Sequence, residues 1–101
     1  MYLIQVLLPL KDNEGRPYGR ELFRAVADEL TERFGGLTAH TQAPAEGLWK
    51  GGKGTSRDEI VIYEVMARKL EKRWWGEYRK GLEERFRQEQ VVVRAHKVEM
   101  L

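Results

Sequence analysis

The sequence predicts an α+β fold of the ferredoxin-like type, a βαββαβ sandwich in which a four-stranded antiparallel sheet carries two helices on one face. Three observations lead to this prediction. Two segments place apolar residues at every fourth position, which is the pattern of one face of a helix. Four segments are short and rich in β-branched residues, which favours strands. Along the chain these segments follow the order strand, helix, strand, strand, helix, strand.

Length and composition restrict the class of protein. One hundred and one residues, 42% of them apolar, suit one compact ferredoxin-like domain over residues 1–101. The sequence contains no cysteine, which rules out a disulfide scaffold, a zinc ribbon and a cysteine nucleophile. Eighteen Lys and Arg against 16 Asp and Glu give a net charge of +2, which is too small an excess to indicate a polyanionic partner.

No part of the sequence has the pattern of a targeting or membrane segment. The apolar start carries no basic residues before it and no small-residue cleavage site after it, unlike a signal peptide. A membrane-spanning helix needs about 20 apolar residues, and no stretch approaches that length. We therefore expect a soluble, cytoplasmic protein.

The first half of the chain supplies a strand, a helix and a second strand. Residues 2–8 are apolar and predict a largely buried strand, and the turn formers of residues 11–19 predict a loop. From Arg20 the apolar spacing of four predicts a helix that ends at Gly35, because glycine adopts the left-handed conformation at little cost. Residues 37–42 alternate and contain threonine, which predicts the second strand.

The second half begins with a long connection and then supplies a strand, a helix and a last strand. Residues 43–58 contain several glycines, a proline and two lysines, so we expect a long mobile loop there. Residues 59–66 have the clearest strand pattern of the chain, and residues 91–98 have the last one. Between them lies a long amphipathic helix, in which Glu83 and Arg87 are spaced to support each other as an i,i+4 pair.

Two helices cover only one face of a four-stranded sheet, so the other face is open. Because side chains alternate along a strand, this open face should carry a set of apolar residues. They are Leu3, Leu7, Ile60, Ile62, Met66, Val92 and Val98. Such a face is too apolar for a monomer, and two-fold dimers are the commonest oligomers. We therefore predict a homodimer that pairs through the open sheet face.

Five polar residues in or beside this apolar set are candidate ligand-binding residues. They are Gln5, His40, Glu64, Arg94 and His96. In a gap between two paired sheets they would line a small-molecule cavity, where His96 or Glu64 moves a proton or a pair of these residues holds a metal. In the alternative interpretation Glu64 and Arg94 form an ion pair, across strands or across the dimer interface, and the histidines are structural. Two histidines far apart in sequence are not a metal motif, and no cofactor is indicated.

The predicted loop at residues 44–57 holds the other candidate residues. They are Trp49, Lys50, Lys53 and Arg57. Its glycines approach the spacing of a phosphate-binding loop, but the threonine comes one place late and the loop joins two strands instead of opening a helix. A nucleotide triphosphatase is therefore excluded. We expect this loop either to cover a small anionic ligand with Trp49 as a lid, or to be a long β-hairpin whose Trp49 packs on the partner subunit.

The second helix interleaves aromatic and basic residues over positions 68–80. Such a pattern can bind single-stranded nucleic acid by stacking and phosphate contact, which makes nucleic-acid binding a minor alternative. Trp74 shares the apolar stripe that faces the core, and only Trp75 is expected to lie off the core. Several glutamates also dilute the positive charge of this helix, so we do not expect nucleic acid to be the partner.

Three motifs give the chain a resemblance to a known family. Residues 33–38 read RFGGLT, residues 47–49 read GLW, and residues 84–91 read ERFRQEQV. In this order (FGGLT … GxW … RFxQxxV) they resemble a functionally uncharacterised family of small bacterial ferredoxin-like proteins. The resemblance covers residues 20–95 and implies the same fold, but no catalytic residue. Many members of that family resemble exported or lipid-anchored proteins, whereas this sequence shows no leader.

The order of elements is more distantly similar to that of the dimeric α/β barrel proteins, which include small monooxygenases and isomerases and pair their open sheets. This is an analogy of fold, and a fold does not fix a function. The sequence thus leaves two main functions open: a homodimer with a small-molecule cavity covered by residues 44–57, and a non-enzymatic interaction or regulatory module. It assigns no enzymatic reaction.

Overall fold

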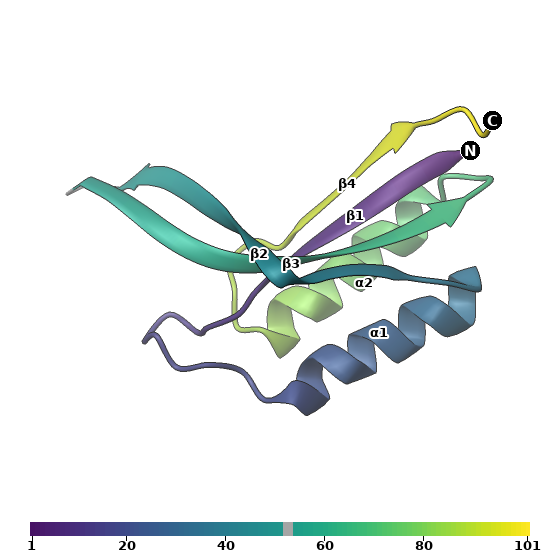
Figure 1. Cartoon of the computed structure of the whole chain (residues 1–101). Helices are drawn as coiled ribbons and strands as arrows, with labels where there is room; N and C mark the ends of the chain where they lie inside the picture. The colour runs from purple at the N-terminus through teal and green to yellow at the C-terminus, as the bar shows by residue number, and fades with distance from the viewer. Residues whose placement is uncertain (52–53) are drawn as a thin grey trace.

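The computed structural model describes the backbone of residues 1–51 and 54–101, and the side chains outside residues 41–58 (Figure 1). The four strands form one antiparallel sheet in the order β2-β3-β1-β4, and both helices lie on one face of it (Figure 1). The predicted ferredoxin-like α+β class is confirmed. The elements in chain order are β1 (Tyr2–Pro9), α1 (Arg20–Phe34), β2 (Thr38–Gly51), β3 (Gly54–Ala67), α2 (Lys72–Arg85) and β4 (Val92–Lys97).

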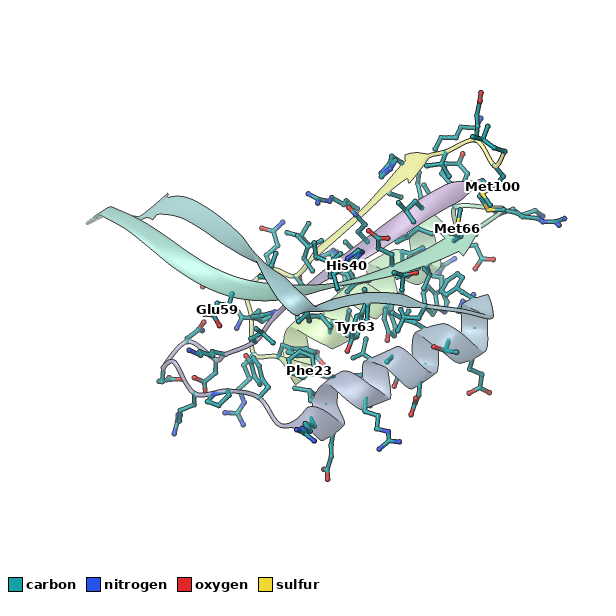
Figure 2. All side chains as sticks on the ribbon, viewed as in Figure 1. Phe23, His40, Glu59, Tyr63, Met66 and Met100 are labelled. Atoms are coloured by element: carbon teal, nitrogen blue, oxygen red, sulfur yellow. The ribbon has the colours of Figure 1, made fainter. Side chains whose placement is uncertain are left out.

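The hydrophobic core lies between the sheet and the two helices. Alternation along the strands turns one set of apolar side chains toward the helices, as the sequence pattern predicts. Figure 2 shows Tyr63 of β3 and Phe23 of α1 on this inner side of the sheet, where the Tyr63 hydroxyl donates to the Phe23 carbonyl at 3.4 Å. The core residues are Ile4, Val6, Leu8, Val26, Leu30, Val61, Tyr63, Val65, Trp75, Leu82, Phe86 and Val91.

The burial of the two adjacent tryptophans of α2 is the reverse of the sequence prediction. Trp75, which the spacing placed off the core, has only 6% of its surface exposed and stacks on Phe34 with ring centroids 5.2 Å apart. Trp74 is half-buried and stacks on Tyr78 at 4.9 Å. The prediction was wrong because a strict spacing of four drifts around a helix of 3.6 residues per turn. The core-facing stripe of α2 instead passes through Trp75 and Leu82.

The ends of both helices are set locally. Gly35 follows α1 with φ 82°, and its N–H donates to the Thr31 carbonyl at 2.8 Å, so the predicted left-handed end of this helix is confirmed. The predicted Glu83–Arg87 pair is wrong, because α2 ends at Arg85 and Arg87 has left the helix with φ 50°. Glu83 instead pairs with Arg79 at 2.8 Å.

β2 and β3 form a long hairpin, which corrects the prediction of a mobile loop over residues 43–58. Residues 45–51 of β2 pair with residues 54–60 of β3, whereas β1 pairs with β3 only from residue 60 onward. The outer part of the hairpin, residues 45–51 and 54–59, therefore extends beyond β1 and away from the helices (Figure 1). We call it the hairpin arm. Glycine and proline signalled a loop, but cross-strand hydrogen bonding keeps this backbone extended.

A register shift between His40 and Ala45 separates the hairpin arm from the inner part of β2. Pro44 falls in this interval, which fits the rule that proline interrupts a strand ladder because it has no N–H to donate.

No helix in the part of the chain that the structure describes is both long enough and apolar enough to cross a membrane.

Candidate functional site on the open sheet face

Four of the five candidate polar residues form one row across the open face of the sheet. The register places Gln5 of β1 between Glu64 of β3 on one side and Arg94 of β4 on the other. His40 of β2 lies next to Glu64 and on the face away from the helices (Figure 2). We call Arg94, Gln5, Glu64 and His40 the polar row. It takes one residue from each of the four strands.

Hydrogen bonds connect Arg94, Gln5 and Glu64, and His40 lies beside Glu64 at the end of the row. Arg94 Nε donates to Gln5 Oε1 at 2.8 Å, and Gln5 Nε2 donates to Glu64 Oε1 at 2.8 Å. His40 Nε2 lies 3.3 Å from the same carboxylate oxygen. A direct Glu64–Arg94 pair across the strands of one chain is therefore wrong, because Gln5 lies between them. Its amide accepts from the guanidinium on one side and donates to the carboxylate on the other.

The polar row keeps Glu64 ionised. The hydrogen bond from Gln5 lowers the pKa of Glu64 below its ordinary value of 4.5, and His40 and the charge of His96 act in the same direction against the effect of partial burial. The Glu64 side chain is 19% exposed. An ionised carboxylate accepts hydrogen bonds and attracts cations, but it has no proton to give at neutral pH. Glu64 therefore suits a binding role better than that of a general acid.

The polar row also leaves charged atoms of both signs unused. Arg94 contributes only its Nε to the row, so its two Nη groups take no part in it, and the residue is exposed. Gln5 and His40 both meet Oε1 of Glu64, so the row does not use Oε2. His96, opposite Leu3 in the register, is also exposed on β4. The open face thus carries a positive charge at Arg94 of β4 and a negative charge at Glu64 of β3.

Apolar side chains border the polar row on both sides. Met66 and Val92, from the predicted open-face set, have 38% and 42% of their surface exposed, although both are large and apolar. The register places Met66 with Leu3 on one side of the row and Val92 with Leu7 on the other. The remaining members of the set are half-buried: Leu3, Leu7, Ile60, Ile62 and Val98. The open face thus combines exposed apolar side chains with a hydrogen-bonded polar row.

The remaining sequence candidates come from the segment that was predicted to be a loop, residues 44–57. The side chains of Trp49, Lys50, Lys53 and Arg57 are outside the described residues. The backbone around them belongs to two paired strands, which is the hairpin alternative of the sequence analysis and not the loop. The contacts of Trp49 with a ligand or a partner subunit stay predictions.

The sequence analysis missed a groove on the other side of β4. This groove, the α2–β4 groove, has a volume of about 300 Å³ and lies between the start of α2 and the outer strand of the sheet. Trp75 and Gly76 contribute to its wall. A glycine inside a strongly periodic helix was the one sequence signal for it.

As for metals, the described residues contain no group of three or more His, Asp or Glu side chains placed to hold an ion.

Comparison with known proteins supports the fold. No protein-family model and no curated protein matches the chain. Among solved structures, a phage SAM lyase in complex with S-methyl-5′-thioadenosine is similar over 95% of this chain and 80% of its own, with a TM-score of 0.60 and 18% identity. CutA of Pyrococcus horikoshii is similar over 100% of this chain and 87% of its own, with a TM-score of 0.62 and 12% identity.

Similarity at these identities shows a shared fold and nothing more. A phage SAM lyase in its apo state gives the same result, with a TM-score of 0.62 and 16% identity. These neighbours are small ferredoxin-like α+β folds, which is consistent with the predicted distant similarity to the dimeric α/β barrel proteins at the level of fold. The resemblance to one uncharacterised bacterial family stays a prediction, because no family model matches.

Proposed function

We propose that two copies of this chain, each acting as one domain, pair through their open sheet faces and bind a small molecule between them at the polar row. The observation that carries this proposal is the polar row itself. It is a hydrogen-bonded line of polar side chains set in an apolar surface that no helix covers. Pairing two such faces would remove the exposed apolar side chains from water and enclose the polar row.

The charges on the open face fit a second copy of the same chain. Consider a two-fold axis parallel to the strands and above Gln5. Rotation about it reverses the strand order, so the Arg94 side of one copy comes opposite the Glu64 side of the other. Each interface then contains two opposite-charge pairings, as an isologous contact requires. The polar row of one copy would thus attract the polar row of the other, because Arg94 and Glu64 pair between the two copies and not within one chain.

Between the paired faces, these opposing charges would hold a ligand that bridges Arg94 of one copy and Glu64 of the other. A guanidinium can bind a carboxylate or phosphate with two parallel hydrogen bonds, which suits the unused Nη groups of Arg94. The Oε2 of Glu64 would accept from an amine or hydroxyl of the same molecule. A small anionic ligand that also carries a hydrogen-bond donor fits both ends, with Gln5, His40 and His96 along its length. The positive charges of Lys50, Lys53 and Arg57, the basic candidates of the predicted loop, would strengthen the attraction of an anion.

One observation favours a second candidate function, that of a non-enzymatic interaction module. The hydrogen bonds of the polar row are complete within one chain between Arg94 and Glu64, so no ligand is needed to satisfy Gln5. In this case the open face would serve assembly alone. Nucleic-acid binding loses its main support, because Trp75 is buried and Trp74 stacks on Tyr78 within the chain.

Native mass spectrometry of the gently purified protein tests the proposal. We expect a dimer that carries additional mass, and we expect Glu64→Gln to lose that mass while the matched variant Glu32→Gln, on the exposed side of α1, keeps it. A dimer without additional mass, also after addition of amino acids and organic phosphates, would favour the interaction module. A monomer at concentrations that suit stable dimers would contradict both candidates.

A further inference from the structure

We infer that the α2–β4 groove is a second binding site, for a small organic anion with an apolar body. This inference does not depend on the pairing of the open faces. β4 is an outer strand, since it pairs with β1 alone, and the groove opens beside it. Its volume of about 300 Å³ is at the lower end of the range found for small-molecule sites.

The floor of the groove is apolar and firmly held. Ile4 of β1 and Trp75 of α2 line it, and both belong to the buried core. Trp75 is fixed from behind by its stacking on Phe34. Val93 of β4 adds a half-buried aliphatic surface. A ligand with an aromatic or branched aliphatic body would therefore meet a rigid surface that loses little freedom on binding.

The rim of the groove carries two cationic side chains from α2, Lys72 and Arg79, and none of its lining residues is acidic. Arg94 also lines the groove, but its guanidinium bonds to Gln5 on the open face of the sheet. Arg79 has one carboxylate partner, Glu83, which is not part of the lining. Positive charge thus converges on an apolar floor. A carboxylate or sulfonate held by these residues would form charge-assisted hydrogen bonds, which are stronger than neutral ones.

Gly76 leaves open space in the wall of the groove. Glycine lowers the stability of a helix interior relative to alanine, and α2 contains two glycines, Gly76 and Gly81, of which only Gly76 lines the groove. A Cβ at this position would meet no atom within 4 Å, so packing inside the chain does not demand glycine there. Gly76 is, however, part of the wall of the groove. A larger side chain at this position would take its volume from the groove.

Fluorescence titration with 1-anilinonaphthalene-8-sulfonate, an anion with an apolar body, tests this inference. We expect saturable binding of one molecule per chain with a change in tryptophan emission, because Trp75 lies in the floor. Lys72→Glu should weaken binding by about tenfold, since it reverses one rim charge. Lys80→Glu is the matched control, because Lys80 is exposed on the same helix and does not line the groove.

The shape of the site is tested separately from its charge. Gly76→Leu should weaken binding at least as much as Lys72→Glu, while Gly81→Leu should leave it unchanged, because Gly81 also has open space at its Cβ but does not line the groove. Circular dichroism checks that each variant is folded. N-phenyl-1-naphthylamine, which lacks the sulfonate, should bind more weakly to the wild-type chain. Binding that is non-saturable, or equal in Lys72→Glu and Lys80→Glu, would overturn the inference.

Discussion

Gln5 donates a 2.8 Å hydrogen bond to Glu64 on the neighbouring strand, and this one contact organises the open face of the sheet. The same amide accepts from Arg94 on its other side. The two opposite charges are thereby held on the two strands that flank β1, Glu64 on β3 and Arg94 on β4. Each of the two side chains keeps atoms that can bind a further partner. A direct ion pair would have neutralised both residues within the chain, and it would have left the open face without its separated charges.

Replacement of Gln5 by leucine is expected to raise the pKa of Glu64 toward its ordinary value of 4.5. The hydrogen bond from Gln5 is the largest influence that lowers this pKa, and leucine cannot donate one. Carboxyl NMR titration of Glu64 measures the change. The variant Gln90→Leu, at an exposed position, should leave the pKa of Glu64 as it is in the wild-type chain. An unchanged pKa in Gln5→Leu would show that the hydrogen bond is not formed in solution.

Glu64 should also make the stability of the protein depend on pH in the acid range. Its folded-state pKa is lowered, so its contribution is complete above the unfolded value of 4.5 and is lost as the pH falls through the folded pKa. We expect Glu64→Gln to reduce the difference in unfolding free energy between neutral pH and pH values below 4.5. Urea unfolding at several pH values measures it, with Glu32→Gln as the control. Equal pH dependence in wild type and Glu64→Gln would contradict the expectation.

The two tryptophans of α2 should differ in their contributions to stability. Trp75→Ala opens a cavity in the core and should lower the free energy of unfolding by about 3–5 kcal/mol. Trp74→Ala should cost less than half as much, because Trp74 is half-buried at the edge of the same cluster. Denaturant unfolding of the two variants provides the comparison. Equal losses, or a larger loss for Trp74→Ala, would reverse the assignment of the core face of α2.

Gly35 and Gly36 offer a matched pair for the end of α1. Gly35→Ala should lower the free energy of unfolding by about 1–2 kcal/mol, because its φ of 82° is unfavourable for a residue with a Cβ. Gly36→Ala should have a much smaller effect, since only Gly35 of the two has a positive φ. Neither Cβ would meet another atom within 4 Å, so the comparison isolates the backbone conformation. Thermal unfolding of both variants measures it.

Much of the fold could be predicted from the sequence because its signals are local. Periodicity of four identified both helices, and alternation placed Val61 and Val65 inward and Met66 outward. For the hairpin arm the sequence left a loop and a hairpin as alternatives, because glycine and proline are local signals whereas strand pairing depends on residues on the partner strand. Trp75 was misplaced for a related reason, since the orientation of α2 is decided by what it packs against.

The sequence predicted which residues belong to the candidate site, but not which of them contact each other. Alternation placed Gln5, Glu64 and Arg94 on the same face, and the structure brings them together. Which of them are neighbours depends on the relative register of three strands, and a single sequence does not determine it. The α2–β4 groove was missed because its walls come from β1, α2 and β4, which only the folded chain places side by side.

Reversal of charge on the open face tests the pairing of two copies most directly. Arg94→Glu and Glu64→Arg each place like charges opposite each other in a homodimer formed about the proposed axis, so each variant alone should be monomeric by native mass spectrometry. Mixed in equal amounts, the two variants should form a dimer of one copy of each, because both opposing pairs are then again of opposite charge. Hydrogen bonds within one chain cannot produce this rescue. Single variants that dimerise like the wild type, or a mixture that stays monomeric, would contradict the pairing of the open faces.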